Sequence, residues 1–357
     1  ILAMQHFKTL KSILDPFGIN VALMTSAQKT KGPYKSPDIF VGTHSLLQKG
    51  VNFKNLALVI VDEQHRFGVA QRALLGKELT GGKAPHMLTM TATPIPRTIA
   101  LTMYGDLDLS LLDEMPKERL KVKTWVVPRR KREAAYKWIK KQVKSTSEQA
   151  FIVCPLIEES EKETMKSVRA ASAEFERLSK KVFPDLKMGL LHGKTKAQEK
   201  EKIMQEMRGG KIDILVATPV VEVGIDIPDA TIMMIETAER FGLAQLHQLR
   251  GRVGRSNKQS YCLLFAENSP PRVLTRLRAM ERTMSGAELA ELDLRLRGPG
   301  EVYGTMQHGF PELNAGSFSD TALIKKARAA AEEMFKKLDK YPKLKKRLEE
   351  KESIGPN

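Results

Sequence analysis

The sequence predicts an α/β protein with parallel sheets, arranged as two lobes that are followed by a helical segment. Short β-rich runs, several of them apolar throughout, alternate with helical stretches such as 131–144 and 196–207. Runs without polar alternation are typical of parallel strands buried on both faces, and strand–helix alternation is typical of βαβ units. A polar segment at 113–123, which contains Pro116, separates two such sets of similar size.

The predicted elements follow the chain in order. Strands are expected at 19–24, 39–41, 56–61 and 87–90 in the first set, and at 149–154, 187–191, 212–217, 231–235 and 260–265 in the second. Pro270 and Pro271 then mark a boundary before a helical stretch at 272–296 and a Gly-rich loop at 297–309. A Lys-rich tail from residue 319 reads as a helix pair broken at Pro342. The expected domains are 1–116, 117–268 and 269–357.

Composition limits the class of protein. A chain of 357 residues, 41% of them hydrophobic, suits two globular domains and a small third unit. Its net charge of +17 favours a polyanionic partner such as nucleic acid, although a basic, solvated surface is the simpler alternative.

The cysteines and the apolar runs exclude several settings. Cys154 and Cys262 form neither a CxxC pair nor a Cys/His cluster, so no disulfide framework or zinc site is expected, and a reducing, cytoplasmic setting is. The apolar run 56–61 is too short to span a bilayer. Charged residues interrupt the N-terminal stretch, which does not read as a signal peptide. Because residue 1 is Ile, we expect the sequence to begin inside a longer protein.

Two carboxylates follow the apolar run 58–61. Asp62 and Glu63 would lie at the carboxyl end of a buried strand, where ligands bind in open α/β sheets. Such an Asp can hold Mg²⁺ through its water shell, and a neighbouring Glu can polarise an attacking water. An ordinary strand followed by a polar turn would look the same. No second histidine stands at ligand spacing from His65, so His65 is not expected to bind a metal.

The string QLHQLRGRVGR at 245–255 carries a second kind of chemistry. Its glycines allow a tight turn, from which Arg252 and Arg255 can project to one side. An arginine that reaches a γ-phosphate stabilises the charge of the transition state. A basic helix start that binds phosphate backbone or solvent is the alternative.

Taken together, these strings resemble the motifs of superfamily 2 DNA helicases, and most closely those of the RecG family. Residues 62–69 (DEQHRFGV) resemble motif II and residues 245–255 resemble motif VI. The other matches are 1–6 (motif Ia), 42–48 (Ib), 91–98 (III), 154–161 (IV), 215–228 (V) and 293–309 (translocation motif). His65 and Pro299 favour RecG over the related transcription-repair coupling translocases. The matches fall in the family's order along the chain, which chance would not produce.

The resemblance implies a role for each matched residue. Asp62 would hold Mg²⁺ through water, Glu63 would activate water, and Gln64 and His65 would link the nucleotide site to the opposite lobe. Arg252 and Arg255 would stabilise the transferring phosphoryl group. Nucleotide binding and coupling are expected at Thr91, Thr93, Gly224, Asp226 and Gln248, DNA contact at Thr43, His44 and Thr218, and translocation at Arg297, Glu301 and Gln307.

The chain also departs from the family pattern. The phosphate-binding loop GxxxxGK[ST] is absent, and the nearest string, at 76–84, has the wrong spacing and reads as a surface turn. The loop is expected upstream, so the first lobe is incomplete. Met306 stands where the family has Arg, Pro219 where it more often has Thr, and the Lys/Gly/Pro-rich segment 27–37 where it has a longer helix.

The expected protein therefore has two RecA-like lobes of the P-loop NTPase type and a helical C-terminal element. By resemblance, ATP and Mg²⁺ occupy the cleft and the backbone of duplex or branched DNA crosses both lobes. The parent enzyme would remodel stalled forks and Holliday junctions in recombination and repair. A monomer at the bacterial nucleoid, with no membrane association and with a single-strand-binding protein as partner, is also implied. A transcription-repair coupling translocase and a non-catalytic DNA-binding fragment are the alternatives.

Overall fold

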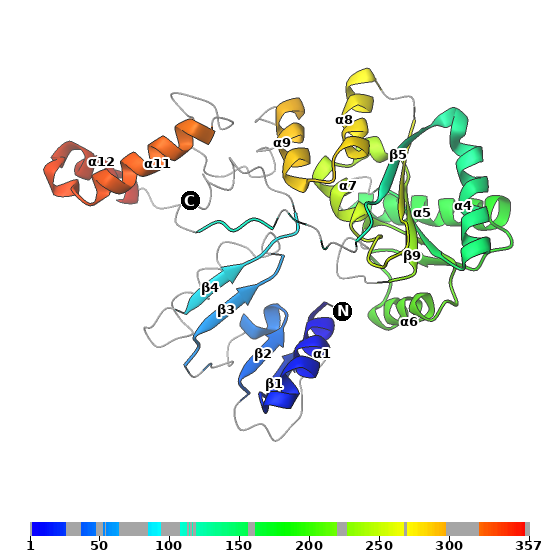
Figure 1. Cartoon of the computed structure of the whole chain (residues 1–357), viewed down its shortest axis with the longest axis horizontal. Helices are drawn as coiled ribbons and strands as arrows, with labels where there is room; N and C mark the ends of the chain where they lie inside the picture. Colours follow the sequence, from blue (N-terminus) through cyan, green and yellow to red (C-terminus); the bar gives the residue numbers. More distant parts are fainter. Residues whose placement is uncertain are drawn as a thin grey trace. The chain divides into compact units, whose positions relative to one another are not determined.

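The computed structural model of the chain consists of two compact units (Figure 1). Unit 1 comprises Ile1–Thr93 with Val220–Ile227, and unit 2 comprises Pro94–Pro219 with Pro228–Asn357. The structure describes residues 2–25, 37–47, 53, 55–63, 85–93, 108–112, 114, 116, 119–155, 161–219, 227–267, 270–297 and 321–353.

The described residues of unit 1 form two pairs of parallel strands and one helix that packs on the first pair. Its elements are α1 (Leu2–Leu14), η1 (Asp15–Phe17), β1 (Val21–Met24), β2 (Ile39–Gly42), η2 (His44–Leu47), β3 (Leu58–Val61) and β4 (His86–Thr89). Strand β1 pairs with β2 from Val21 opposite Ile39, and β3 pairs with β4 from Leu58 opposite His86. Parallel pairing places the ends of paired strands at the same edge, which matters for the residues that follow them.

Unit 2 is built on a six-stranded parallel sheet in the order β5-β10-β9-β6-β8-β7. The strands are β5 (Lys123–Pro128), β6 (Gln149–Val153), β7 (Met188–Leu191), β8 (Ile214–Ala217), β9 (Ala230–Ile235) and β10 (Tyr261–Ala266). Every residue of β6, β8 and β9 is buried, as the unbroken apolar runs predict for strands covered on both faces.

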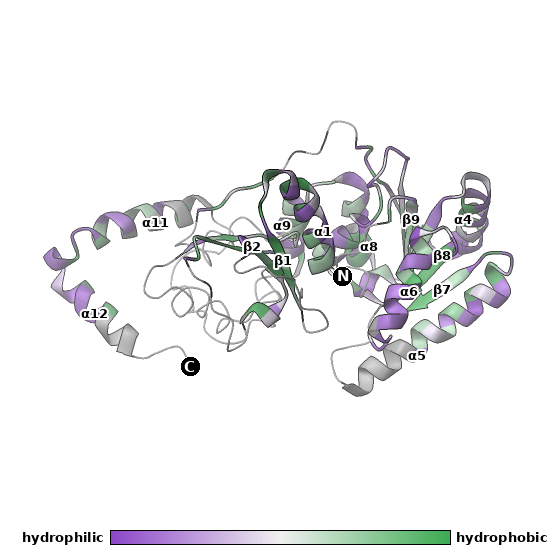
Figure 2. Ribbon diagram, turned by 90° about the horizontal axis from the view of Figure 1, so that it is seen from below, coloured by the Kyte–Doolittle hydropathy of each residue, from purple (hydrophilic) through white to green (hydrophobic). Residues whose placement is uncertain are grey.

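Helices surround this sheet (Figure 1). They are α4 (Arg132–Thr146), α5 (Glu161–Arg177), α6 (Ala197–Arg208), α7 (Leu243–Arg250), α8 (Pro271–Arg282) and α9 (Gly286–Arg297), with shorter turns η4 (Arg129–Lys131), η5 (Leu178–Val182) and η7 (Ala238–Arg240). Ile139 of α4, Leu178 of η5 and Phe183 are fully buried in the core against the sheet. Figure 2 shows the hydrophobic residues of this unit in β8 and β7, with hydrophilic residues on α4 and α6.

The predicted α/β architecture is confirmed, with two corrections. Strand β5 was not predicted, because its sequence KTWVVP begins with Lys, ends with Pro and continues a polar segment. The single helical stretch expected over 272–296 is two helices, α8 and α9, because Ser285 caps a new helix start: its Oγ accepts the Glu288 N–H at 3.3 Å. The predicted tail is confirmed as a helix pair, α11 (Thr321–Phe335) and α12 (Pro342–Ser353), with η8 (Leu338–Lys340) between them. The domain limits at 116 and 268 stay predictions.

Candidate functional site

The carboxylates predicted for catalysis lie directly after β3. Glu63 has a φ of 52°, a left-handed conformation that costs a non-glycine residue roughly 1–2 kcal/mol. Its backbone N–H donates to Asp62 Oδ1 at 2.9 Å, and His6 Nε2 from α1 lies 3.4 Å from Asp62 Oδ2. Backbone strain of this kind persists where the surroundings enforce it and is concentrated at functional turns.

The neighbouring strand β4 brings two threonines to the same edge. The Met90 N–H donates to Val61 O at 2.8 Å, so the two strands end side by side. Thr91 Oγ1 then accepts the Thr93 N–H at 3.1 Å. The structure therefore places Asp62, Glu63 and both threonines at one edge of a two-stranded sheet.

The candidate DNA contacts of unit 1 follow β2. Thr43 and His44 are exposed. Thr43 Oγ1 lies 3.1 Å from Ser45 Oγ, which donates to Met24 O at 2.9 Å. A Cβ on Gly42 would lie 2.3 Å from Met24 O, so only glycine allows the chain to pass this close. The turn therefore presents Thr43 and His44 to solvent on a fixed backbone.

Thr218, the candidate DNA contact of unit 2, follows β8 and is 1% exposed. Its N–H donates to Leu191 O at 3.1 Å, while its Oγ1 has no hydrogen-bond partner among the described residues. Contact with a DNA backbone would require the surroundings of Thr218 to move.

The arginine-rich string forms the end of α7 and the turn after it. The Gly251 N–H donates to His247 O and the Arg252 N–H donates to Leu249 O, both at 3.0 Å. Gly254 has a φ of +75°, and a Cβ there would lie 2.8 Å from Val122 Cγ2. This position therefore requires glycine for two reasons: its φ is positive, and a Cβ would be too close to Val122.

The side chains of this string differ in exposure. Arg252 and Gln248 are partly buried, whereas Arg255 is exposed and its Nε donates to Gly251 O at 3.4 Å. At the far end of the turn, Arg119 Nε donates to Gly254 O at 2.7 Å. The segment 251–255 is thus a short turn whose backbone is held by hydrogen bonds at both ends.

Several candidate residues lie outside the described structure. They are Gln64, His65, Gly224, Asp226, Glu301 and Gln307. Met306 and the rest of residues 220–226 in the motif V string also lie outside it. Arg297 ends α9, and its side chain is likewise outside the description. The predicted surface turn at 76–84 and the segment 27–36 also fall there.

Sequence reasoning missed a buried polar network around Glu236, which directly follows β9. Glu236 is 6% exposed, and its carboxylate accepts hydrogen bonds from Arg132 Nη2 at 2.7 Å and from Tyr136 Oη at 3.1 Å. Burial raises the pKa of the Glu236 carboxyl. The sequence signal for Glu236 is a carboxylate directly after an apolar strand, as at Asp62. A single acidic residue at such a position is common, so the pattern alone does not indicate a functional residue.

The same network continues to α5. Arg177 Nη2 donates to Tyr136 Oη at 2.8 Å and to Glu174 Oε1 at 2.6 Å. Burial, reinforced by the nearby carboxylates, raises the pKa of the Cys154 thiol to about 12. Cys154 is therefore a neutral core residue and not a nucleophile. The network ties α4 and α5 to the end of β9, where the chain leads into α7.

A buried arginine of α8 holds the loop between β9 and α7. Arg276 of α8 donates to Phe241 O at 2.8 Å and to Glu239 O at 2.7 Å. Asp293 of α9 lies 3.8 Å from Arg276 and accepts the Leu243 N–H at 3.3 Å. The first residue of the predicted translocation string thus contacts the start of the helix that carries the arginine-rich turn.

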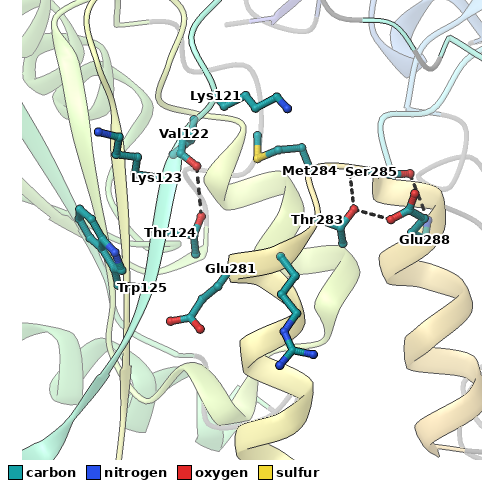
Figure 3. Close-up of a pocket in the computed structure, with 11 residues that line it drawn as sticks. Lys121, Val122, Lys123, Thr124, Trp125, Glu281, Thr283, Met284, Ser285 and Glu288 are labelled. Carbon is teal, nitrogen blue, oxygen red and sulfur yellow. Dashed lines mark hydrogen bonds between the residues drawn. The ribbon is translucent and has the colours of Figure 1, made fainter.

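Unit 2 also contains an open pocket of about 680 Å³ between β5 and the turn from α8 to α9 (Figure 3). Lys121, Lys123 and Trp125 line one side, and Glu281 and Glu288 lie on the other. Glu281 Oε1 accepts the Val126 N–H at 2.7 Å and so covers part of the outer edge of β5. None of the predicted site residues that the structure describes lines the pocket.

Both parts of the chain are similar in sequence to known helicases. Residues 1–102 match the sequence profile of the DEAD/DEAH box helicases, and residues 131–257 match that of the helicase conserved C-terminal domain. The chain is 49% identical over 351 residues to the ATP-dependent DNA helicase RecG of Aquifex aeolicus, covering 94% of the chain and 43% of that protein. It is 46% identical over 360 residues to the Synechocystis RecG, covering 98% and 42%. The chain spans less than half the length of these relatives.

A solved structure agrees with the sequence relatives. The structure of RecG bound to a three-way DNA junction matches with a TM-score of 0.71 and 41% identity, over 91% of this chain and 41% of that one. The fold prediction of two RecA-like helicase lobes is thereby confirmed. No helix in the described part of the chain is long and apolar enough to cross a membrane.

Proposed function

Because the chain is similar in sequence to the RecG helicases and matches two helicase profiles, we propose that it is the motor portion of an ATP-dependent DNA translocase. The observation that carries this proposal is the sequence match over 94% of the chain, which includes both lobes. The edge of the β3–β4 pair supports it, since it gathers the acidic and hydroxyl side chains that the chemistry requires.

The proposed reaction is the attack of a water molecule on the γ-phosphorus of ATP, which releases ADP and inorganic phosphate. Glu63 accepts the proton of that water, and Asp62 orients the turn through its hydrogen bond to the Glu63 N–H. Arg252 and Arg255 stabilise the negative charge that develops on the phosphoryl group, an effect worth roughly 10³–10⁵ in rate for such arginines. Thr91 and Thr93 respond to the nucleotide state next to the carboxylates, and Gln248, Gly224 and Asp226 complete the nucleotide and coupling set.

The residues present fit Mg²⁺ held through its water shell. Asp62 directly follows β3 and its side chain is partly exposed, and Mg²⁺ is commonly held by one or two carboxylates while it keeps several waters. Among the described residues no cluster of three ligand side chains forms an all-protein metal cage. When bound, Mg²⁺ supplies charge neutralisation at the β- and γ-phosphate oxygens.

The exposed turn that carries Thr43 and His44 is proposed to bind DNA. Thr218 is proposed to bind DNA after the residues that bury it have moved. The net charge of +17 supports binding to a phosphate backbone. The relative solved on a three-way junction supports branched DNA as the substrate, including stalled forks and Holliday junctions. Arg297, Glu301 and Gln307 are proposed to couple lobe movement to translocation, with Met306 as a departure from the family pattern.

Fork remodelling is the activity to test. The experiment uses a polypeptide extended upstream through the expected phosphate loop, a fluorescently labelled three-way junction, and a linear duplex of the same length. The proposal expects ATP-dependent release of a strand from the junction, and none with Arg255→Ala. Equal, ATP-independent binding to both DNAs with no strand release would instead favour a DNA-binding protein without motor activity.

A further inference from the structure

The guanidinium of Arg250 is buried at the end of α7, with no acidic partner among the described residues. Arg250 is 1% exposed and is among the largest fully buried side chains of the protein. Its Nη1 donates to Met280 O at 2.8 Å and to Thr283 O at 2.9 Å, and its Nη2 lies 3.0 Å from His247 Nδ1. Within the described part of the chain, no carboxylate forms an ion pair with it. Burial of an arginine in this way is costly, so its contacts need an explanation.

Both carbonyls that Arg250 binds belong to the end of α8. Met280 lies in the last turn of that helix, and Thr283 is the residue that follows it. The last carbonyls of a helix have no partner within the helix, and a positive charge there is also favoured by the helix dipole. Arg250 therefore attaches the end of α7 to the turn between α8 and α9.

The turn that receives Arg250 is itself well ordered by hydrogen bonds (Figure 3). Thr283 Oγ1 accepts the Ser285 N–H at 3.0 Å and donates to Glu288 Oε2 at 2.5 Å. Ser285 Oγ accepts the Glu288 N–H at 3.3 Å. These bonds order the turn that carries the Thr283 carbonyl, one of the two carbonyls to which Arg250 donates.

The turn 251–255 begins at Arg250 with no spacer. The Arg252 N–H donates to Leu249 O, on the other side of Arg250, and Arg119 holds Gly254 O at the far end. Any displacement of Arg250 would therefore move the backbone from which Arg252 and Arg255 project. A shift of about 1 Å in a catalytic group can cost about 100-fold in rate.

We propose that Arg250 is a positioning residue that sets the place of Arg252 and Arg255 by joining the end of α7 to the turn between α8 and α9. This inference rests on the proposed function for the role of the two arginines. The attachment of the turn to α8 does not depend on that function and can be measured separately.

The first measurement uses the chain itself and two substitutions at one position. Arg250→Met keeps most of the side-chain volume but leaves the Met280 and Thr283 carbonyls unpaired, and Arg250→Lys keeps the charge on a single donor nitrogen. Leu178→Ala is the matched control, because Leu178 is fully buried in the core of the same unit and contacts neither turn. Amide hydrogen exchange is followed at 251–255 and 281–285, well below the unfolding temperature.

The expected result is selective. Arg250→Met should accelerate exchange in both segments about tenfold or more relative to the rest of unit 2, with a smaller effect for Arg250→Lys. Leu178→Ala should accelerate exchange without that selectivity. If Arg250→Met behaves like Leu178→Ala, Arg250 is a packing residue and the proposal is wrong.

The second measurement uses the upstream-extended polypeptide and steady-state ATP hydrolysis. Arg250→Met should lower kcat roughly 10–100-fold while KM for ATP changes less than about twofold, and Arg250→Lys should restore part of kcat. An unchanged kcat would overturn the proposal. If the extended wild type does not hydrolyse ATP but exchange at both turns changes selectively, the proposed function fails while the anchoring by Arg250 is supported.

Discussion

The imidazole of His247 gives a prediction for stability against pH. Its Nδ1 lies 3.0 Å from Arg250 Nη2, and a neutral ring can accept that hydrogen bond whereas a protonated ring cannot. Burial, followed by the charge of Arg250, lowers the pKa of His247 from 6.5 to about 4. His247→Gln removes the titration and retains an amide oxygen that can accept from Arg250.

The magnitude follows from the difference between the two states. At about 1.4 kcal/mol for each tenfold change in an acid constant, the full effect is about 3 kcal/mol. Because the folded pKa is lowered, the unfolded chain binds more protons between pH 4 and 6.5, and stability falls as the pH falls through this window. Between pH 7 and pH 4.5, His247 alone should remove about 2.5 kcal/mol from the free energy of unfolding.

Urea unfolding, followed by tryptophan fluorescence, measures the stability of unit 2, which contains His247. The two tryptophans of the chain, Trp125 and Trp138, both lie in unit 2 and pack together with Tyr261. The wild type should lose about 2.5 kcal/mol more than His247→Gln between pH 7 and pH 4.5. His192→Gln serves as a control for the loss of a histidine in the same unit. Parallel pH profiles of stability for the wild type and His247→Gln would show that His247 does not cause this pH dependence.

Three further predictions concern other parts of the site. Gly254→Ala should destabilise unit 2 by about 1–3 kcal/mol, because of its φ of +75° and the 2.8 Å approach to Val122; an unchanged urea midpoint would contradict this. Arg132→Met should cost about 2–4 kcal/mol, since it leaves the buried Glu236 carboxylate unpaired, and a loss below about 0.5 kcal/mol in the same assay would show that the pair is dispensable. The affinity of the chain for duplex DNA, measured by fluorescence anisotropy, should fall steeply between about 50 and 200 mM salt, whereas a flat response would exclude backbone contacts.

The sequence was sufficient to predict the buried strands of the fold and the position of Asp62 and Glu63 at the end of a strand. Strands β6, β8 and β9 are uninterrupted apolar runs, which parallel strands require. Asp62 and Thr91 lie at the same end of the β3–β4 pair because Asp62 directly follows β3 and Thr91 follows β4 after one intervening residue.

The remaining features depend on tertiary contacts that pattern does not specify. Strand β5 was not predicted because polar residues flank it. It is defined as a strand by its pairing with β10. The break between α8 and α9 did have a local signal, the capping pattern from Ser285 to Glu288, which the helical periodicity of the stretch obscured. Among the arginines of the 245–255 string, sequence could not distinguish the buried Arg250 from the exposed Arg255, because only packing against α8 buries the first.

The central claim is that this chain carries the catalytic residues of an ATP-driven DNA motor. The most direct test is DNA-stimulated ATP hydrolysis by the chain and by a polypeptide extended upstream through the expected phosphate loop, each as wild type and as Glu63→Gln. We expect only the extended wild type to hydrolyse ATP. An inactive extended wild type, or an extended Glu63→Gln variant with full activity, would contradict it.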